Sequence, residues 1–171
     1  MTGPGYDVLV VLHVLSAVIG FGAVGATGTY AGRARSLAEP RDDPNLRRYF
    51  RPGTNWAELV MLLTPVLGAA LLFGGDRSAV SQPWPWIGLG CWVLAAGVVS
   101  AWCWPAERRI QAWLAAGADS GWSAASELGS GRSAASELGQ FRDACRVVQR
   151  GAFAIAVLFL VAVVVMIGQP R

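Results

Sequence analysis

An uncharged stretch of 22 residues near the start of the chain, Val8 to Thr29, most constrains the fold. It contains no Asp, Glu, Lys or Arg. At about 1.5 Å per residue, a helix of this length extends about 33 Å, enough to cross a hydrocarbon core of about 30 Å. The residues before it carry no positive charge, and the stretch exceeds the roughly 7 to 15 residues of a signal-peptide core. We therefore expect a retained membrane-spanning helix.

The helix expected over 8–29 has two different faces. On a wheel of about 100° per residue, the residues near His13 are small or weakly polar, and those opposite it are bulky and aliphatic. The first group is Ser16, Ala17, Gly20, Val24, Thr27 and Gly28, and the second is Val8, Leu12, Leu15 and Ile19. This division predicts that the first face packs on neighbouring helices and the second meets lipid. His13, the only histidine, is thus expected to point inward, where an ionisable residue is a candidate site.

Three further apolar segments, 56–73, 84–104 and 151–167, predict additional spans. The segments 31–55 and 105–150 between them are expected to be loops outside the membrane, with Asp43 and Pro44 opening a short surface helix. Pro65 should kink the second span and release a carbonyl for a neighbour or a ligand. The expected fold class is all-α, a transmembrane four-helix bundle with up-down-up-down topology, forming a single integral-membrane domain over residues 1–171.

The arginines predict the orientation of this bundle. Each of the two large loops carries six arginines, whereas only Arg77 and Arg171 lie on the other side. Basic loops tend to stay in the cytoplasm, so the excess of twelve arginines over two predicts that both large loops are cytoplasmic and both termini are outside. Contact with anionic lipid is the alternative reading of the arginine cluster over 31–55.

The second loop contains two further features. After Pro105, the apolar residues Ile110, Trp113 and Leu114 share one helix face, which predicts a helix along the membrane surface. The decapeptide GWSAASELGS over 121–130 then recurs as GRSAASELGQ over 131–140. Two copies cannot form a stacked array, so we expect a tolerant loop segment.

Three residues of the expected bundle have side chains that bind soft or borderline metals. His13, Cys91 and Met166 are each predicted to lie near the outer end of their span, and imidazole, thiolate and thioether suit copper or haem iron. His13 is the predicted cofactor ligand, with Cys91, Met166 or His13 of a second copy as the second ligand. The alternative is a hydrogen-bonded structural histidine. We interpret Glu58 as an acid that lies at the membrane interface or is paired with a loop arginine. A role in proton transfer is the alternative.

The segment Leu12 to Gly22, LHVLSAVIGFG, resembles the first helix of several small bacterial membrane families. These are the copper-resistance protein D membrane domain, the HemJ-type protoporphyrinogen oxidases and a predicted four-helix integral-membrane family of unknown function. The stretch Thr64 to Gly68, Thr-Pro-x-x-Gly, is most similar to the last of them. The resemblance implies a multi-pass protein of the bacterial inner membrane.

Other classes of function have little support in the sequence. No basic stripe interleaved with aromatic residues lies outside the expected spans, so nucleic acid is not an expected partner. The three cysteines show no CxxC spacing, which disfavours a disulfide framework or structural zinc. We therefore expect an inner-membrane protein whose precise role the sequence does not define, with the binding of haem b or copper through His13 as a hypothesis and enzymatic activity left open. The alternative is a non-catalytic membrane partner or assembly subunit, and a homo-dimer is compatible with both.

Overall fold

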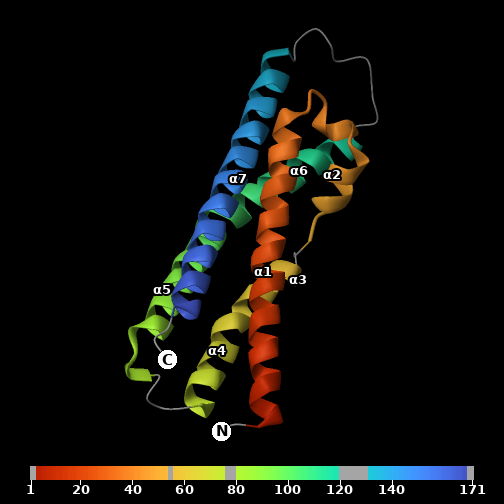
Figure 1. Ribbon diagram of the computed structural model, residues 1–171. Helices are drawn as coiled ribbons and strands as arrows, with labels where there is room; N and C mark the ends of the chain where they lie inside the picture. Colours follow the sequence, from red (N-terminus) through yellow and green to blue (C-terminus); the bar gives the residue numbers. More distant parts are fainter. Residues whose placement is uncertain (1–2, 54–55, 76–79, 120–130, 169–171) are drawn as a thin grey trace. The chain divides into compact units, whose positions relative to one another are not determined.

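The computed structural model describes residues 3–53, 56–75, 80–119 and 131–168 (Figure 1). All regular structure in these ranges is helical, as the all-α class requires. In chain order the elements are α1 (Pro4–Ser36), the 3₁₀ turn η1 (Pro40–Asp42), α2 (Pro44–Tyr49), α3 (Trp56–Leu59), the 3₁₀ turn η2 (Val60–Leu62), α4 (Leu63–Gly74), α5 (Pro83–Val98), the π-helical turn η4 (Val99–Cys103), α6 (Trp104–Asp119) and α7 (Gly131–Ile167).

Three of these helical segments are long and apolar enough to cross a membrane, judged by length and composition. They are Pro4–Ser36, Pro83–Ala116 and Ala135–Ile167. The segment expected as the second span consists of α3, η2 and α4, and its apolar helical part, Val60–Gly74, is shorter than the other three. The chain is thus a helical protein with the properties of a membrane protein.

The described contacts divide the chain into two compact units. The first comprises Met1–Ala26, Asn55–Val98 and Phe153–Arg171, and the second comprises Thr27–Thr54 and Val99–Ala152. Each unit is described below by itself.

In the first unit, α1 has the two faces that its sequence predicts. Ser16, Gly20 and Val24 are buried, whereas the bulky residues of the opposite face are exposed. These exposed residues include Leu12 at 46% and Ile19 at 48%. Large aliphatic side chains rarely cover a surface that faces water, so this face is suited to lipid.

The inward face of α1 packs against α4 and η2 through residues spaced seven apart. Tyr6 lies beside Gly75, His13 beside Gly68, and Gly20 beside Met61. As the α1 residue number rises, that of its partner falls, so the two segments are antiparallel. The closest approach is at Gly20, where a Cβ atom would lie 2.5 Å from the backbone nitrogen of Met61. A seven-residue spacing is typical of helices that cross at a small angle.

Pro65 releases a backbone carbonyl to a neighbouring helix, as predicted from the sequence. Proline has no N–H, so Met61, four residues earlier, lacks the usual α-helical donor for its carbonyl. The indole nitrogen of Trp92 on α5 donates to this Met61 carbonyl at 3.0 Å. The break between η2 and α4 is therefore also the attachment point of α5.

Two further contacts in the first unit involve α7. Met166 approaches α5 at Gly88, where a Cβ atom would lie 2.9 Å from the Met166 Cε. Phe159 stacks on Phe21 of α1, with ring centroids 4.8 Å apart. Glycine at position 88 therefore makes room for a flexible thioether, and an aromatic pair joins α7 to α1.

The second unit has its own apolar core, which the sequence interpretation missed. It is formed by residues of α1, α2, α6 and α7 together with Phe50, which follows α2: Ala31, Ala34, Leu46, Phe50, Ala106, Ile110, Leu114, Phe141, Ala144, Cys145 and Val148. The apolar face of α6, expected to lie along the membrane surface, is in this core instead. An amphipathic face fits either environment, and here α1, α2 and α7 provide apolar partners for it.

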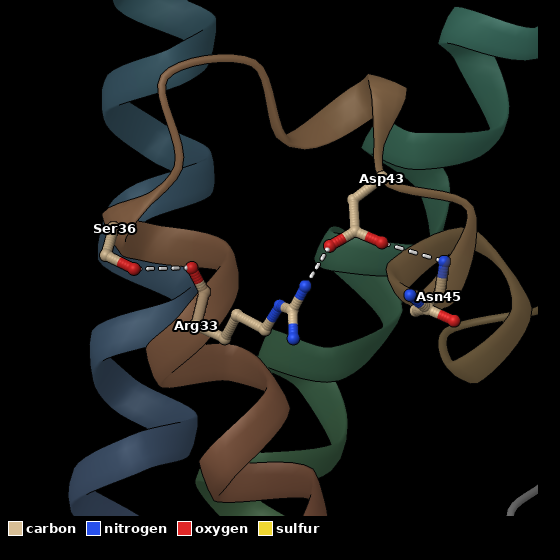
Figure 2. Close-up of polar contacts among 4 residues, drawn as sticks. All are labelled: Arg33, Ser36, Asp43 and Asn45. Atoms are coloured by element: carbon tan, nitrogen blue, oxygen red, sulfur yellow. Dashed lines mark hydrogen bonds and ion pairs between the residues drawn. The ribbon is translucent and has the colours of Figure 1, made fainter.

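The turn from α1 to α2 confirms the predicted helix start at Asp43. One Asp43 carboxylate oxygen accepts from the Asn45 backbone N–H at 2.8 Å, and the other accepts from Arg33 at 3.1 Å (Figure 2). The Ser36 hydroxyl donates to the carbonyl of Arg33 at 2.8 Å, at the end of α1 (Figure 2). These polar contacts fix the turn, and Leu46 and Phe50 anchor the α2 segment in the core.

The repeated decapeptide is only partly within the described residues. Its first copy, 121–130, lies outside them, whereas the second copy, 131–140, forms the first turns of α7. Leu138 of the second copy packs on the core of the second unit. The second copy is thus part of a packed helix, which corrects its interpretation as a loop.

Candidate functional site

His13 lies on the inward face of α1, and its ring is half buried. Its Nδ1 atom is 2.9 Å from the backbone carbonyl oxygen of Thr64 on α4. A carbonyl oxygen can only accept, so Nδ1 carries the proton in this hydrogen bond. In a neutral imidazole, the lone pair is then on Nε2, which is the tautomer that metal-binding histidines adopt when a carbonyl orients them.

Gly68 lies against the His13 ring, and Ser16 bonds to the His13 backbone. A Cβ atom at Gly68 would lie 3.1 Å from the ring carbon Cε1, so glycine at this position leaves room for the imidazole. Ser16 is buried, and its hydroxyl donates to the His13 carbonyl at 2.8 Å. The same hydroxyl lies 3.2 Å from the Thr64 hydroxyl. We call His13, Ser16, Thr64 and Gly68 the His13 cluster.

The His13 cluster joins α1 to the first turns of α4. Ser16 is one turn after His13, so both side chains reach the same partner helix. Thr64 and Gly68 are likewise one turn apart on α4. Thr64 supplies the oxygen atoms that bond to His13 and Ser16, and Gly68 leaves space for the His13 ring. The arrangement can hold an imidazole in one orientation within an apolar helix pair.

Cys91 and Met166, the other predicted ligands, lie on α5 and α7. Cys91 is a free, half-buried cysteine, and Met166 is 36% exposed. The described neighbour of Met166 is Gly88, three residues before Cys91 on α5. Within the described ranges, no group of three or more His, Cys, Asp and Glu side chains is placed to hold a metal ion.

Two buried carboxylic acids lie outside the His13 cluster. Glu58 of α3, in the first unit, is only 3% exposed and has an interaction partner. Glu107 of α6, in the second unit, is 7% exposed, and its Oε1 accepts from the side-chain amide of Gln111 at 3.4 Å. Glu58 is therefore within the protein rather than at an exposed interface, and its partner offsets part of the cost of burying a carboxylic acid.

Asp43, at the start of α2, has a pKa that is lowered by its surroundings. Desolvation acts to raise the pKa of Asp43, but hydrogen bonds from the backbone of Asn45 and Leu46 and the charge of Arg33 outweigh it. The net result is a pKa below its ordinary value of 3.8. Asp43 therefore remains ionised at neutral pH and paired with Arg33.

Thr64, Gly68 and Trp92 have specific contacts that the sequence interpretation did not assign. Thr64 and Gly68 stood out only as part of the Thr-Pro-x-x-Gly stretch. Trp92 could have been found by asking which donor serves the carbonyl that Pro65 releases, because a buried indole N–H usually has an acceptor. The identity of each partner depends on helix register, which the local sequence does not specify.

No family model, curated protein or solved structure matches this chain.

Proposed function

We propose that the chain is a multi-pass protein of the bacterial inner membrane, with four helical segments in up-down-up-down order and both termini outside. Contacts within the first unit support this arrangement. They join α1 to α4, η2 to α5, α5 to α7 and α7 to α1, so each segment contacts the next and the last contacts the first. The excess of arginine in the two long connections supports the orientation.

Within this protein, His13 binds a transition metal, either as haem b iron or as copper. The observation that carries this proposal is the hydrogen bond from Nδ1 to the Thr64 carbonyl. It orients the ring and leaves the Nε2 lone pair available, as in metal sites whose histidines are held by a second hydrogen bond. A neutral imidazole is a good ligand for both metals.

One histidine seldom holds a metal ion by itself, so a second ligand is required. Cys91, Met166 and His13 of a second copy are the candidates. Met166 and Cys91 have suitable chemistry on α7 and α5 of the same unit, and a homo-dimer would supply a second imidazole.

A non-catalytic membrane partner or assembly subunit is the second candidate function. It is favoured by the packing of His13 itself, because the contacts with Thr64 and Gly68 account for a histidine that only joins two helices. This alternative predicts that His13 contributes to stability and binds no metal.

The two functions are separated by an absorption spectrum and a metal analysis of the purified protein. Cells are supplied with a haem precursor in one preparation and with copper in another. Haem binding predicts a Soret band, and copper binding predicts copper in a fixed ratio to protein. His13→Ala should abolish whichever signal the wild type shows.

Two variants separate ligation from folding. His13→Gln retains an amide that can donate to Thr64 but removes the imidazole, so it should lose the metal and remain folded. Ser16→Ala removes a hydroxyl of the same cluster and should keep the metal. A wild type that is colourless and free of metal in both preparations would contradict the metal proposal and support the structural role.

A further inference from the structure

The second unit contains a surface cavity of about 410 Å³ between the end of α1 and α2. Its lining residues are Tyr30 of α1 and Asn45, Arg48 and Tyr49 of α2. Asn45 and Arg48 are exposed, and the two tyrosine rings are half buried. The cavity thus combines a polar, accessible rim with aromatic walls.

The aromatic walls are held in place by three contacts. The Tyr30 and Tyr49 rings stack with centroids 4.0 Å apart. The Tyr49 hydroxyl lies 2.8 Å from the hydroxyl of Thr27, which is itself buried. Phe50 meets Tyr49 edge-on at 5.2 Å and is anchored in the core. The cavity is therefore supported by the packed part of the unit.

The lining favours an anion. Arg48 supplies a guanidinium group, Asn45 supplies an amide, and no carboxylate is among the lining residues. Asp43, two residues before Asn45 in the sequence, already accepts from Arg33 and from the Asn45 backbone (Figure 2). Asp43 is thus paired within the turn, and Arg48 forms no ion pair among the residues that the structure describes, so its charge can serve a ligand. Guanidinium, amide and phenol groups together are suited to the oxygen atoms of a phosphate ester.

The position of the cavity along α1 indicates where this phosphate comes from. The uncharged part of α1 continues through Gly32, and Tyr30 lies three residues before Arg33, the first charged residue at this end. Tyrosine is enriched where a membrane helix leaves the hydrocarbon core, at the depth of lipid headgroups. A pocket that contains an arginine at this depth is suited to an anionic headgroup.

We infer that this cavity binds the phosphate of an anionic phospholipid, with Arg48 as its principal ligand. Asn45 adds a neutral hydrogen-bond donor, and the stacked tyrosines contact the glycerol part of the headgroup. The inference requires only that α1 is embedded in a membrane, and it is independent of any metal at His13.

The test compares Arg48→Gln with Arg47→Gln. The two arginines are adjacent on α2 and both are exposed, but only Arg48 lines the cavity. The full-length protein is purified in detergent, stripped of lipid and titrated with phosphatidylglycerol, while its melting temperature and its bound lipid by native mass spectrometry are recorded. Arg48→Gln should raise the apparent Kd for phosphatidylglycerol roughly tenfold, because a charge-assisted hydrogen bond is lost. Arg47→Gln should bind like the wild type.

Two further arms identify the ligand. Phosphatidylcholine should bind more weakly than phosphatidylglycerol, and soluble glycerol phosphate at equal concentration should have little effect. Asn45→Asp, which adds a carboxylate to the cavity, should also weaken phosphatidylglycerol binding. Equal affinities of the Arg47 and Arg48 variants for phosphatidylglycerol would contradict the assignment of this cavity as the binding site. A response to glycerol phosphate as large as that to phosphatidylglycerol would overturn the assignment to a lipid.

Discussion

Replacing Gly20 by alanine tests the close packing of α1 against η2. The added Cβ atom would lie 2.5 Å from the Met61 backbone nitrogen and 2.6 Å from its Cα atom. Favourable contacts between carbon atoms are about 3.5 to 4.0 Å, so one helix must move by about 1 Å. Overpacking of this kind typically costs about 1–3 kcal/mol of unfolding free energy.

Gly22→Ala is a matched control on the same helix. A Cβ atom at Gly22 would have no neighbour within 4 Å. Both substitutions gain about 0.5–1 kcal/mol from the higher helix propensity of alanine. The difference between them therefore isolates the clash, and Gly20→Ala should be less stable than Gly22→Ala by about 1–3 kcal/mol.

Thermal unfolding of the purified protein in detergent measures this difference. For a chain of this size, it corresponds to several degrees in melting temperature. Gly20→Leu should destabilise the protein more than Gly20→Ala, whereas Ile19→Ala, at a residue that is 48% exposed, should have a smaller effect. Equal melting temperatures for Gly20→Ala and Gly22→Ala would refute the proximity of α1 to Met61.

Three other predictions concern the turn, the repeat and the orientation. The pKa of Asp43 is lower in the folded state than its ordinary value of 3.8. The ionised Asp43 should therefore stabilise the fold fully at a pH above the pKa of the unfolded state, and this stabilisation should be lost as the pH falls below 3.8 through the pKa of the folded state. The acid sensitivity of unfolding should therefore decrease in Asp43→Asn, which keeps the cap. Deleting 131–140 should leave the melting temperature nearly unchanged because the first copy takes the place of the second, whereas deleting 121–140 should lower it. In a background without native cysteines, Arg47→Cys should react with an impermeant reagent only from the cytoplasmic side and Gln82→Cys only from outside; the reverse would contradict the orientation.

The sequence predicted the features of this fold that depend on local chemistry. The two faces of α1 follow from its 3.6-residue period, and the start of α2 follows from the capping preference of Asp43 before Pro44. The missing N–H of Pro65 predicted that a carbonyl would be released to a neighbour. Each of these features needs information from only a few consecutive residues.

The features that the sequence did not predict depend on which segments meet. An apolar stripe such as Ile110 and Leu114 has the same pattern whether it meets lipid or protein, so the core of the second unit could not be inferred. Likewise, an inward His13 was predictable, but its acceptor on Thr64 was not. The second decapeptide was misinterpreted because Leu138 contacts a core that the local sequence does not indicate.

The contact between Trp92 and the Met61 carbonyl has a consequence for biogenesis. The helical segment over 56–74 is synthesised before α5, so its proline-released carbonyl must first find a donor other than Trp92. A poorly satisfied backbone carbonyl is costly in hydrocarbon, and until α5 arrives the Met61 carbonyl has only the nearby backbone N–H of Leu63 and water as donors. A nascent chain that ends before α5 is thus expected to keep the Met61 region near the aqueous boundary of the translocon. The hydrogen bond from Trp92 is therefore expected to favour full insertion of the 56–74 segment only after α5 has been synthesised.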